Sequence, residues 1–217
     1  MTDLIAVNVL LEPDQATLAR AGALNDALHG SFPSGFAFDD SHHAHATVVQ
    51  RYVRRDDLSR LFGAVADSLA GAGIAGLRLQ AVGLVSGRFG TPPGTALASI
   101  ELEPSPTLTG LQAALVEAIA PFGRRGGAGE AFFRRGTEAA VNDETVAYVE
   151  DFVPARTAER YSPHISVGVG TDELVAELQA RPFEAFDVIP VAVGVYQLGD
   201  LGTARARLHS WMLDPEA

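Results

Sequence analysis

The apolar residues of the chain fall into runs of two kinds, one typical of strands and one typical of helices. Short runs rich in Val, Ile, Leu and Ala, bounded by turn residues, predict strands at 4–11, 44–53, 77–85, 96–102, 164–169, 189–198 and 204–213. Apolar residues three or four positions apart predict helices at 14–29, 56–70, 107–120 and 142–153, and a further helix that Thr171 caps. The glycine- and arginine-rich stretch at 123–136 predicts a mobile loop.

The order of these elements repeats along the chain. The strands that begin near 44 and 164 are each followed by a helix and then by two strands, which indicates a weak internal duplication. The sequence therefore predicts one α+β domain over 1–217, made of two pseudo-symmetric lobes. Each lobe is expected to be a small antiparallel sheet backed by helices, with a cleft between the two lobes.

A short phrase stands at the head of two of the predicted strands. It reads HATVV at 45–49 and HISVG at 164–168, and YSP precedes the second copy. Each copy is a histidine, one apolar residue and a small hydroxyl residue, inside a run typical of a strand. A third match, at 29–31, contains glycine and precedes Phe-Pro, which is typical of a turn. The strand context, found twice, distinguishes the first two copies from a chance match.

Strand geometry fixes how the side chains of this phrase are arranged. Successive side chains of a strand point to opposite faces, so His45 and Thr47 share a face, as do His164 and Ser166. Two such strands brought together at the cleft place two imidazoles and two hydroxyls around one pocket. An imidazole exchanges protons near neutral pH, because its ordinary pKa is about 6.5. The set is therefore suited to moving protons at a phosphate ester.

The composition narrows the chemistry. The chain has no cysteine, which excludes disulfides and thiolate sites, and all 16 basic residues are Arg, which excludes a lysine nucleophile. The net charge of −11 disfavours a long nucleic acid duplex and favours a small nucleotide or an RNA end as partner.

No apolar run approaches the roughly 18 residues of a membrane helix, and no basic segment typical of a signal peptide is found. We expect a cytoplasmic protein without a membrane partner.

The two motifs together resemble a known family. HATVV and YSPHISVG are similar to the paired motifs of the two-histidine (2H) phosphoesterase superfamily, which includes the 2′-5′ RNA ligase-like proteins and the cyclic nucleotide phosphodiesterases. The resemblance covers the two motifs and the order of elements around them. The two histidines lie 119 positions apart, which is long for this group, and we expect the extra length to be a flexible insert at 123–143.

This resemblance implies a bilobal fold and a metal-independent reaction, without a cofactor, on 2′,3′-cyclic phosphates or 2′-5′ linkages of a nucleotide or RNA end. It assigns the catalytic roles to His45 and His164, one as general acid and one as general base. It assigns the binding of the phosphate oxygens to Thr47 and Ser166. Which histidine is the acid stays open.

Other side chains near the motifs are candidate substrate contacts. By strand alternation His43 shares the face of His45, and it is expected either to touch the ligand, to tune His45 or to be solvated. Arg51 shares that face if the strand stays regular, and it is expected either to pair with phosphate or to lie on the surface. Tyr161 is expected either to stack on a base or to pack in the core. The loop arginines are expected either to fold over a substrate phosphate as a lid or to be solvated; they are Arg124, Arg125, Arg134 and Arg135. Phe132 and Phe133, between the arginine pairs, are candidates for stacking on a base.

Two other functions remain open on the sequence. The first is a binding module of the same fold, which holds a nucleotide or RNA end without turnover. The second is a metal-dependent hydrolase, because two aspartates and three histidines cluster at 39–45. Adjacent histidines of a strand point to opposite faces, which disfavours a shared metal ion. A scaffold role has no repeat array or coiled coil to support it.

Overall fold

The computed structural model describes residues 3–74, 76–136 and 138–213, and its strands pair antiparallel in one sheet. The strands are β1 (Leu4–Pro13), β2 (Ala46–Arg54), β3 (Leu79–Gly87), β4 (Thr95–Leu102), β5 (His164–Thr171), β6 (Phe186–Val188), β7 (Pro190–Leu198) and β8 (Ala204–Met212). Their order across the sheet is β6-β3-β4-β5-β2-β1-β7-β8. All seven strands predicted from the apolar runs are present, and the three-residue β6 was missed because it is too short to show a pattern.

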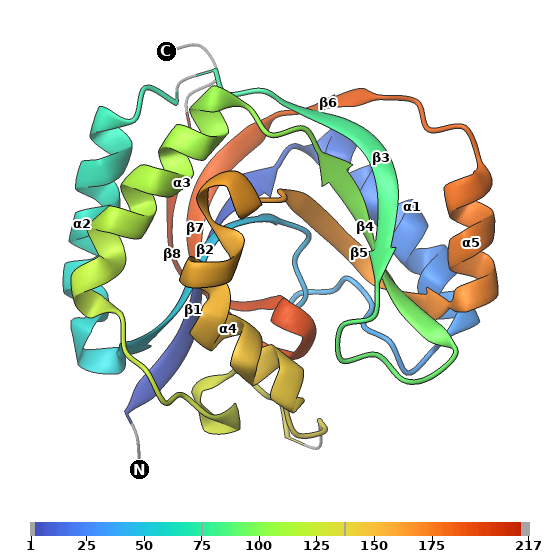
Figure 1. Cartoon of the computed structure of the whole chain (residues 1–217), viewed down its shortest axis with the longest axis horizontal. Helices are drawn as coiled ribbons and strands as arrows, with labels where there is room; N and C mark the ends of the chain where they lie inside the picture. Colours follow the sequence, from blue (N-terminus) through green and yellow to red (C-terminus); the bar gives the residue numbers. More distant parts are fainter. Residues whose placement is uncertain (1–2, 75, 137, 214–217) are drawn as a thin grey trace.

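The prediction of two separate sheets was wrong, although the sheet has two similar halves. The half β6-β3-β4-β5 and the half β2-β1-β7-β8 meet where β2 and β5 pair through one residue of each strand, Ala46 opposite Ile165. These are the middle residues of the two histidine motifs. The motif strands therefore lie edge to edge in one curled sheet instead of facing each other across separate lobes (Figure 1).

In the part of the chain that the structure describes, five α-helices cover the two halves of this sheet. They are α1 (Gln15–Ser31), α2 (Leu58–Gly71), α3 (Pro106–Ile119), α4 (Asp143–Arg156) and α5 (Asp172–Ala180). Helices α1 and α5 pack on the half that contains β3, β4 and β5, and α3 packs on β2 with α2 beside it (Figure 1). The capping side chains Asp14, Ser105, Asn142 and Thr171 accept backbone N–H bonds at the helix N-termini, which explains where four of these helices begin. No helix in the described ranges is both long and apolar enough to span a membrane.

Each motif strand carries a β-bulge directly after its hydroxyl residue. On β2, Thr47 and Val49 oppose consecutive residues of β1, so Val48 is the extra residue. On β5, Ser166 and Gly168 oppose consecutive residues of β4, so Val167 is the extra residue. A bulge reverses the alternation of side chains beyond it. The two motifs therefore share a β-bulge at the same position, as well as a sequence pattern.

Two buried amide side chains satisfy the backbone of these bulges. Gln112 on α3 donates to the carbonyl of Val48 at 3.1 Å, and Asn25 on α1 donates to the carbonyl of Val167 at 2.9 Å. Each amide also bonds the segment that leads into a motif: Asn25 contacts the backbone at 36 and 38, and Gln112 contacts the backbone at 156 and 158. The helices therefore fix the positions of both motifs.

Candidate active site

A cavity of about 380 Å³ brings the four predicted motif side chains together. His45, Thr47, His164 and Ser166 all line it. Because Ala46 and Ile165 are paired across β2 and β5, continuing that antiparallel register sets His45 beside Ser166 and Thr47 beside His164. The two halves of the sheet therefore each supply one imidazole and one hydroxyl to a single wall.

Both imidazoles are held by the same kind of hydrogen bond. Nδ1 of His45 lies 2.8 Å from the carbonyl oxygen of His43, and Nδ1 of His164 lies 2.8 Å from the carbonyl oxygen of Ser162. A carbonyl oxygen only accepts hydrogen bonds, so Nδ1 carries the hydrogen in both rings. The neutral form of each ring then has its basic nitrogen at Nε2, the atom that is left for proton transfer in the cavity.

Burial shifts the proton affinity of both rings in the same direction. It lowers the pKa of His45 to about 4, while the bond to the His43 carbonyl opposes the shift and His164 adds to it. Burial also lowers the pKa of His164, and the nearby Arg156 guanidinium contributes to that shift. The free protein at neutral pH therefore holds both imidazoles uncharged.

The two motif hydroxyls have matching partners on the neighbouring strands. Asn8 on β1 donates from Nδ2 to Oγ1 of Thr47 at 2.9 Å, which leaves the hydrogen of that hydroxyl available to another acceptor. Oγ of Ser166 lies 3.2 Å from Oγ of Ser99 on β4. Both motif hydroxyls are thereby positioned in the cavity wall, next to the imidazole of the other motif.

The charge of the cavity is opposite to that of the chain as a whole. Arg88 and Arg156 line it, and none of its described lining residues is acidic, whereas the chain carries a net charge of −11. Arg88 also pairs with Asp172 at 2.7 Å. Sequence reasoning missed Arg156, because only the packing of the C-terminal end of α4 brings it to the motifs. The cavity is suited to an anion.

Aromatic rings form the wall on the side of α4 and the β3–β4 hairpin. Phe89 and Tyr148 meet edge to face with ring centres 5.0 Å apart, and Phe152 continues the cluster at 5.7 Å from Tyr148. The guanidinium of Arg156 lies 5.2 Å from the ring centre of Tyr148. The sequence analysis missed these rings, although an aromatic residue in the Gly/Pro-rich hairpin was a usable signal for Phe89.

Of the two functions open for Tyr161, the structure supports packing and adds a structural link. The ring is buried in the main core and lines the cavity at one edge. Its hydroxyl donates to the backbone carbonyl of Thr47 at 2.8 Å, so it joins the approach of the second motif to the first motif strand. Burial raises the pKa of Tyr161 well above that of a free tyrosine, which keeps the hydroxyl protonated and able to donate.

Two other candidates lie outside the main cavity. His43 packs against Tyr196 with ring centres 5.4 Å apart and lines a separate small cavity with His45. Arg51 shares the face of His45 only in a regular strand, and β2 is not regular, because the bulge at Val48 reverses its alternation. Gln50 lines the cavity in its place, and its buried Oε1 has no hydrogen-bond partner in the described residues.

The loop arginines and phenylalanines are not brought into this cavity. Phe132 is buried against Tyr52 with ring centres 5.9 Å apart, and Arg124 pairs with the buried Asp57 at 3.1 Å. Arg125 pairs with Glu150. That the segment 123–143 is a flexible insert, and that its arginines close over a ligand, stay predictions.

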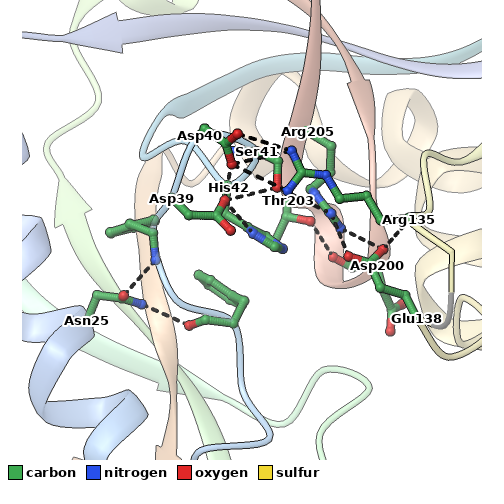
Figure 2. A network of polar contacts seen from close by, with 12 residues as sticks. Asn25, Asp39, Asp40, Ser41, His42, Arg135, Glu138, Asp200, Thr203 and Arg205 are labelled. Atoms are coloured by element: carbon green, nitrogen blue, oxygen red, sulfur yellow. Dashed lines mark hydrogen bonds and ion pairs between the residues drawn. The ribbon is translucent and has the colours of Figure 1, made fainter.

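The cluster at 39–45 is divided among different partners. Asp39 pairs with His42 at 3.0 Å, and Asp40 faces Arg135 at 3.3 Å (Figure 2). His45 lines the main cavity instead. No group of three potential metal ligands is arranged for a metal ion among the residues that the structure describes. The geometry gives the metal-dependent alternative no support.

Comparison with known proteins finds similarity only at the level of structure. No family model and no curated protein matches the chain. Among solved structures, E. coli LigT complexed with 3′-AMP is 12% identical, with a TM-score of 0.47, over 97% of this chain and 98% of that chain. E. coli LigT complexed with NADP+ is 11% identical, with a TM-score of 0.44, over 97% and 99%. Kluyveromyces marxianus Usb1 is 10% identical, with a TM-score of 0.42, over 95% and 98%. The chemistry is argued below from this chain's own residues.

Proposed function

We propose that this chain is a metal-independent phosphoesterase of the 2H type, which opens a 2′,3′-cyclic phosphate, or breaks a 2′-5′ phosphodiester, of a nucleotide or RNA end. One observation carries the proposal. Two imidazoles with the same Nδ1–carbonyl anchor line one cavity that contains two arginines and whose described lining includes no carboxylate. That arrangement supplies two proton-transfer groups and attracts the phosphate between them.

The reaction needs both imidazoles. In hydrolysis of a cyclic phosphate, one neutral imidazole takes a proton from water as the new P–O bond forms. The other, protonated, imidazole gives its proton to the ribose oxygen as the P–O bond to that oxygen breaks. Thr47 and Ser166 donate hydrogen bonds to the non-bridging oxygens, and Arg156 offsets the charge that develops there. The imidazole on the side of the ribose oxygen is the general acid, and the imidazole on the side of the water is the general base.

The nucleoside is placed against the aromatic wall. Phe89 and Tyr148 offer ring surface for a base, and base–aromatic stacking contributes about 1–3 kcal/mol per base. Gln50 lines the same cavity, and an amide suits a ribose hydroxyl or a base amino group. These contacts give binding without a carboxylate or a metal ion.

Turnover in a chelator tests the proposal directly. The wild-type chain at pH 6 in excess EDTA is expected to convert adenosine 2′,3′-cyclic phosphate to a single adenosine monophosphate. Chromatography of the reaction mixture measures the product. Persistence of activity in EDTA is expected because no step uses a metal. Tight binding of the cyclic nucleotide without turnover supports the binding module instead, and activity that EDTA abolishes supports the metal-dependent hydrolase.

The pH dependence follows from the lowered pKa of each imidazole. Catalysis needs one neutral and one protonated ring, and burial holds the pKa of His45 at about 4 and the pKa of His164 below its usual value. We therefore expect kcat/KM, which reports the free enzyme, to be greatest between about pH 4 and 6.5 and to fall at higher pH. Bound phosphate stabilises the protonated ring, so kcat is expected to fall at a higher pH than kcat/KM. A kcat/KM optimum above pH 7.5 contradicts this assignment.

A further inference from the structure

One polar side chain interrupts the apolar centre of β1. From Ile5 to Leu11 every residue of this strand is buried, and Asn8 is the one polar residue among them. Its neighbours on the same face of the strand, Ala6 and Leu10, are apolar and fully buried. Asn8 is 0% exposed and does not line the cavity of the motif histidines. Any effect of Asn8 on a substrate is therefore exerted through another side chain.

The amide of Asn8 is only half satisfied. Its Nδ2 donates to Oγ1 of Thr47 at 2.9 Å, whereas its Oδ1 has no hydrogen-bond partner in the described residues. The register places Gln50 on β2 and Tyr196 on β7 opposite Asn8. The hydroxyl of Tyr196 donates to Glu12 at 3.0 Å instead. A buried amide oxygen without a partner costs stability, which an apolar side chain at this position avoids.

The β-bulge on β2 creates the contact between Asn8 and Thr47. In a regular strand Thr47 and Gln50 lie on opposite faces, because they are three positions apart. The extra residue Val48 reverses the alternation, so that both line the cavity and both share a face with Asn8. Thr47 is paired with Leu10, two residues along β1 from Asn8, which makes Asn8 its diagonal neighbour. The bulge that presents Thr47 to the cavity thus also presents it to the amide.

This bond determines what the hydroxyl of Thr47 can do. An amide N–H only donates, so Oγ1 accepts from Asn8 and keeps its single hydrogen for another acceptor. The other motif hydroxyl is not fixed in this way, since Oγ of Ser166 lies 3.2 Å from Oγ of Ser99 and either of the two can donate. Of the two motif hydroxyls, Thr47 is therefore the one whose hydrogen is kept for a ligand.

We propose that Asn8 is a positioning residue, which keeps Thr47 as a hydrogen-bond donor to a non-bridging oxygen of the reacting phosphate. The inference rests on the proposed function. Negative charge grows on that oxygen as water attacks phosphorus, and a donor that is already oriented stabilises the charge without rearrangement. Without the amide, the hydroxyl turns its hydrogen toward other acceptors for part of the time. Asn8 thereby raises kcat without touching the substrate.

Substitutions of Asn8 test the proposal on adenosine 2′,3′-cyclic phosphate. Asn8→Leu keeps the branching of the side chain and removes the bond, and we expect it to lower kcat about tenfold. Its melting temperature is expected to stay within about 2 °C of the wild type or to rise, because no amide is left half satisfied. Asn8→Ala, which cannot overpack the core, is expected to lower kcat by a similar factor.

Asn8→Asp reverses the direction of the bond. The carboxylate has the size of the amide but only accepts, so it takes the hydrogen of Thr47 away from the cavity. We expect this variant to lose as much kcat as Thr47→Val, about 10²-fold. An Asn8→Asp variant with wild-type kcat overturns the proposal.

A double-mutant cycle separates positioning from a general disturbance of β1. In the Thr47→Val background, Asn8→Leu is expected to lower kcat by less than about twofold further, because the group that it positions is already absent. In the Ser166→Ala background, which keeps Thr47, the full loss of about tenfold is expected. A structural disturbance lowers kcat by the same factor in both backgrounds, and that result contradicts a positioning role.

Failure of the proposed function gives a different result. If the wild-type chain does not turn over the cyclic phosphate, calorimetric binding of adenosine 2′-monophosphate decides the role of Asn8. Asn8→Leu must then weaken binding at least about threefold in the wild-type background and by less than about 1.5-fold in the Thr47→Val background. Equal weakening in the two backgrounds, unchanged binding, or no binding by the wild type overturns the inference.

Discussion

Replacing either His45 or His164 by alanine is expected to lower kcat for adenosine 2′,3′-cyclic phosphate by about 10²–10⁴-fold, because each positioned proton transfer contributes about that factor. The double variant is expected to lose little more than the worse single variant, since the two rings act in one step. Steady-state kinetics at pH 6 measure the loss. The matched control is His209→Ala, an exposed histidine on the edge strand β8, which is expected to keep wild-type kcat.

A substrate with an activated leaving group shows which of His45 and His164 is the general acid and which is the general base. Adding a nitrophenol leaving group removes the need for a general acid, because nitrophenolate departs without protonation. The alanine variant that regains most of its activity on this substrate identifies the acid, and the variant that stays inactive identifies the base. If neither variant loses activity on the cyclic phosphate, His45 and His164 are not the catalytic pair.

Gln112→Met is expected to produce the largest loss of stability among changes of a single buried polar side chain. The amide donates to the carbonyl of Val48 and accepts from the N–H of Ala158, and it is only 1% exposed. Methionine keeps the size but leaves these backbone groups unpaired, at about 1–3 kcal/mol for each buried group. We expect unfolding to become easier by about 3–4 kcal/mol, with a melting temperature lower by about 10 °C.

Thermal and urea unfolding of Gln112→Met measure this effect. Gln15→Met is the matched control, because Gln15 is exposed on α1, and it is expected to change the melting temperature by less than about 2 °C. The folded fraction of Gln112→Met is also expected to have a lower kcat, since Gln112 holds the bulge beside Thr47 and the segment before His164. A variant as stable as the wild type shows that the bulge does not depend on the amide.

Local patterns predicted most of the fold. The strands and helices are determined by apolar periodicity and by caps such as Asp14 and Thr171, which act within a few residues. The same local alternation placed His45 with Thr47, and His164 with Ser166, on shared faces, and the structure brings all four to one cavity. These properties depend on neighbours in sequence, so the sequence shows them.

Long-range packing decided the parts that the sequence analysis missed. The single sheet follows from the pairing of Ala46 with Ile165, and no local pattern distinguishes that pairing from two separate sheets. Arg51 was assigned to the site and Gln50 was not, because the bulge at Val48 reverses the alternation of β2. The carbonyl of Val48 accepts from the amide of Gln112, 64 residues away along the chain. Arg156 reaches the cavity only through the docking of α4.

The sequence by itself determined the elements, the duplicated motif and the four groups offered for chemistry, because strand alternation and helical periodicity are set by neighbouring residues. The tertiary structure decided how the two motif strands join, where each bulge turns the side chains, and which side chains line one cavity. Those outcomes depend on contacts such as that of Asn25 with the carbonyl of Val167, whose partners are 142 positions apart. Folding alone brings such partners together.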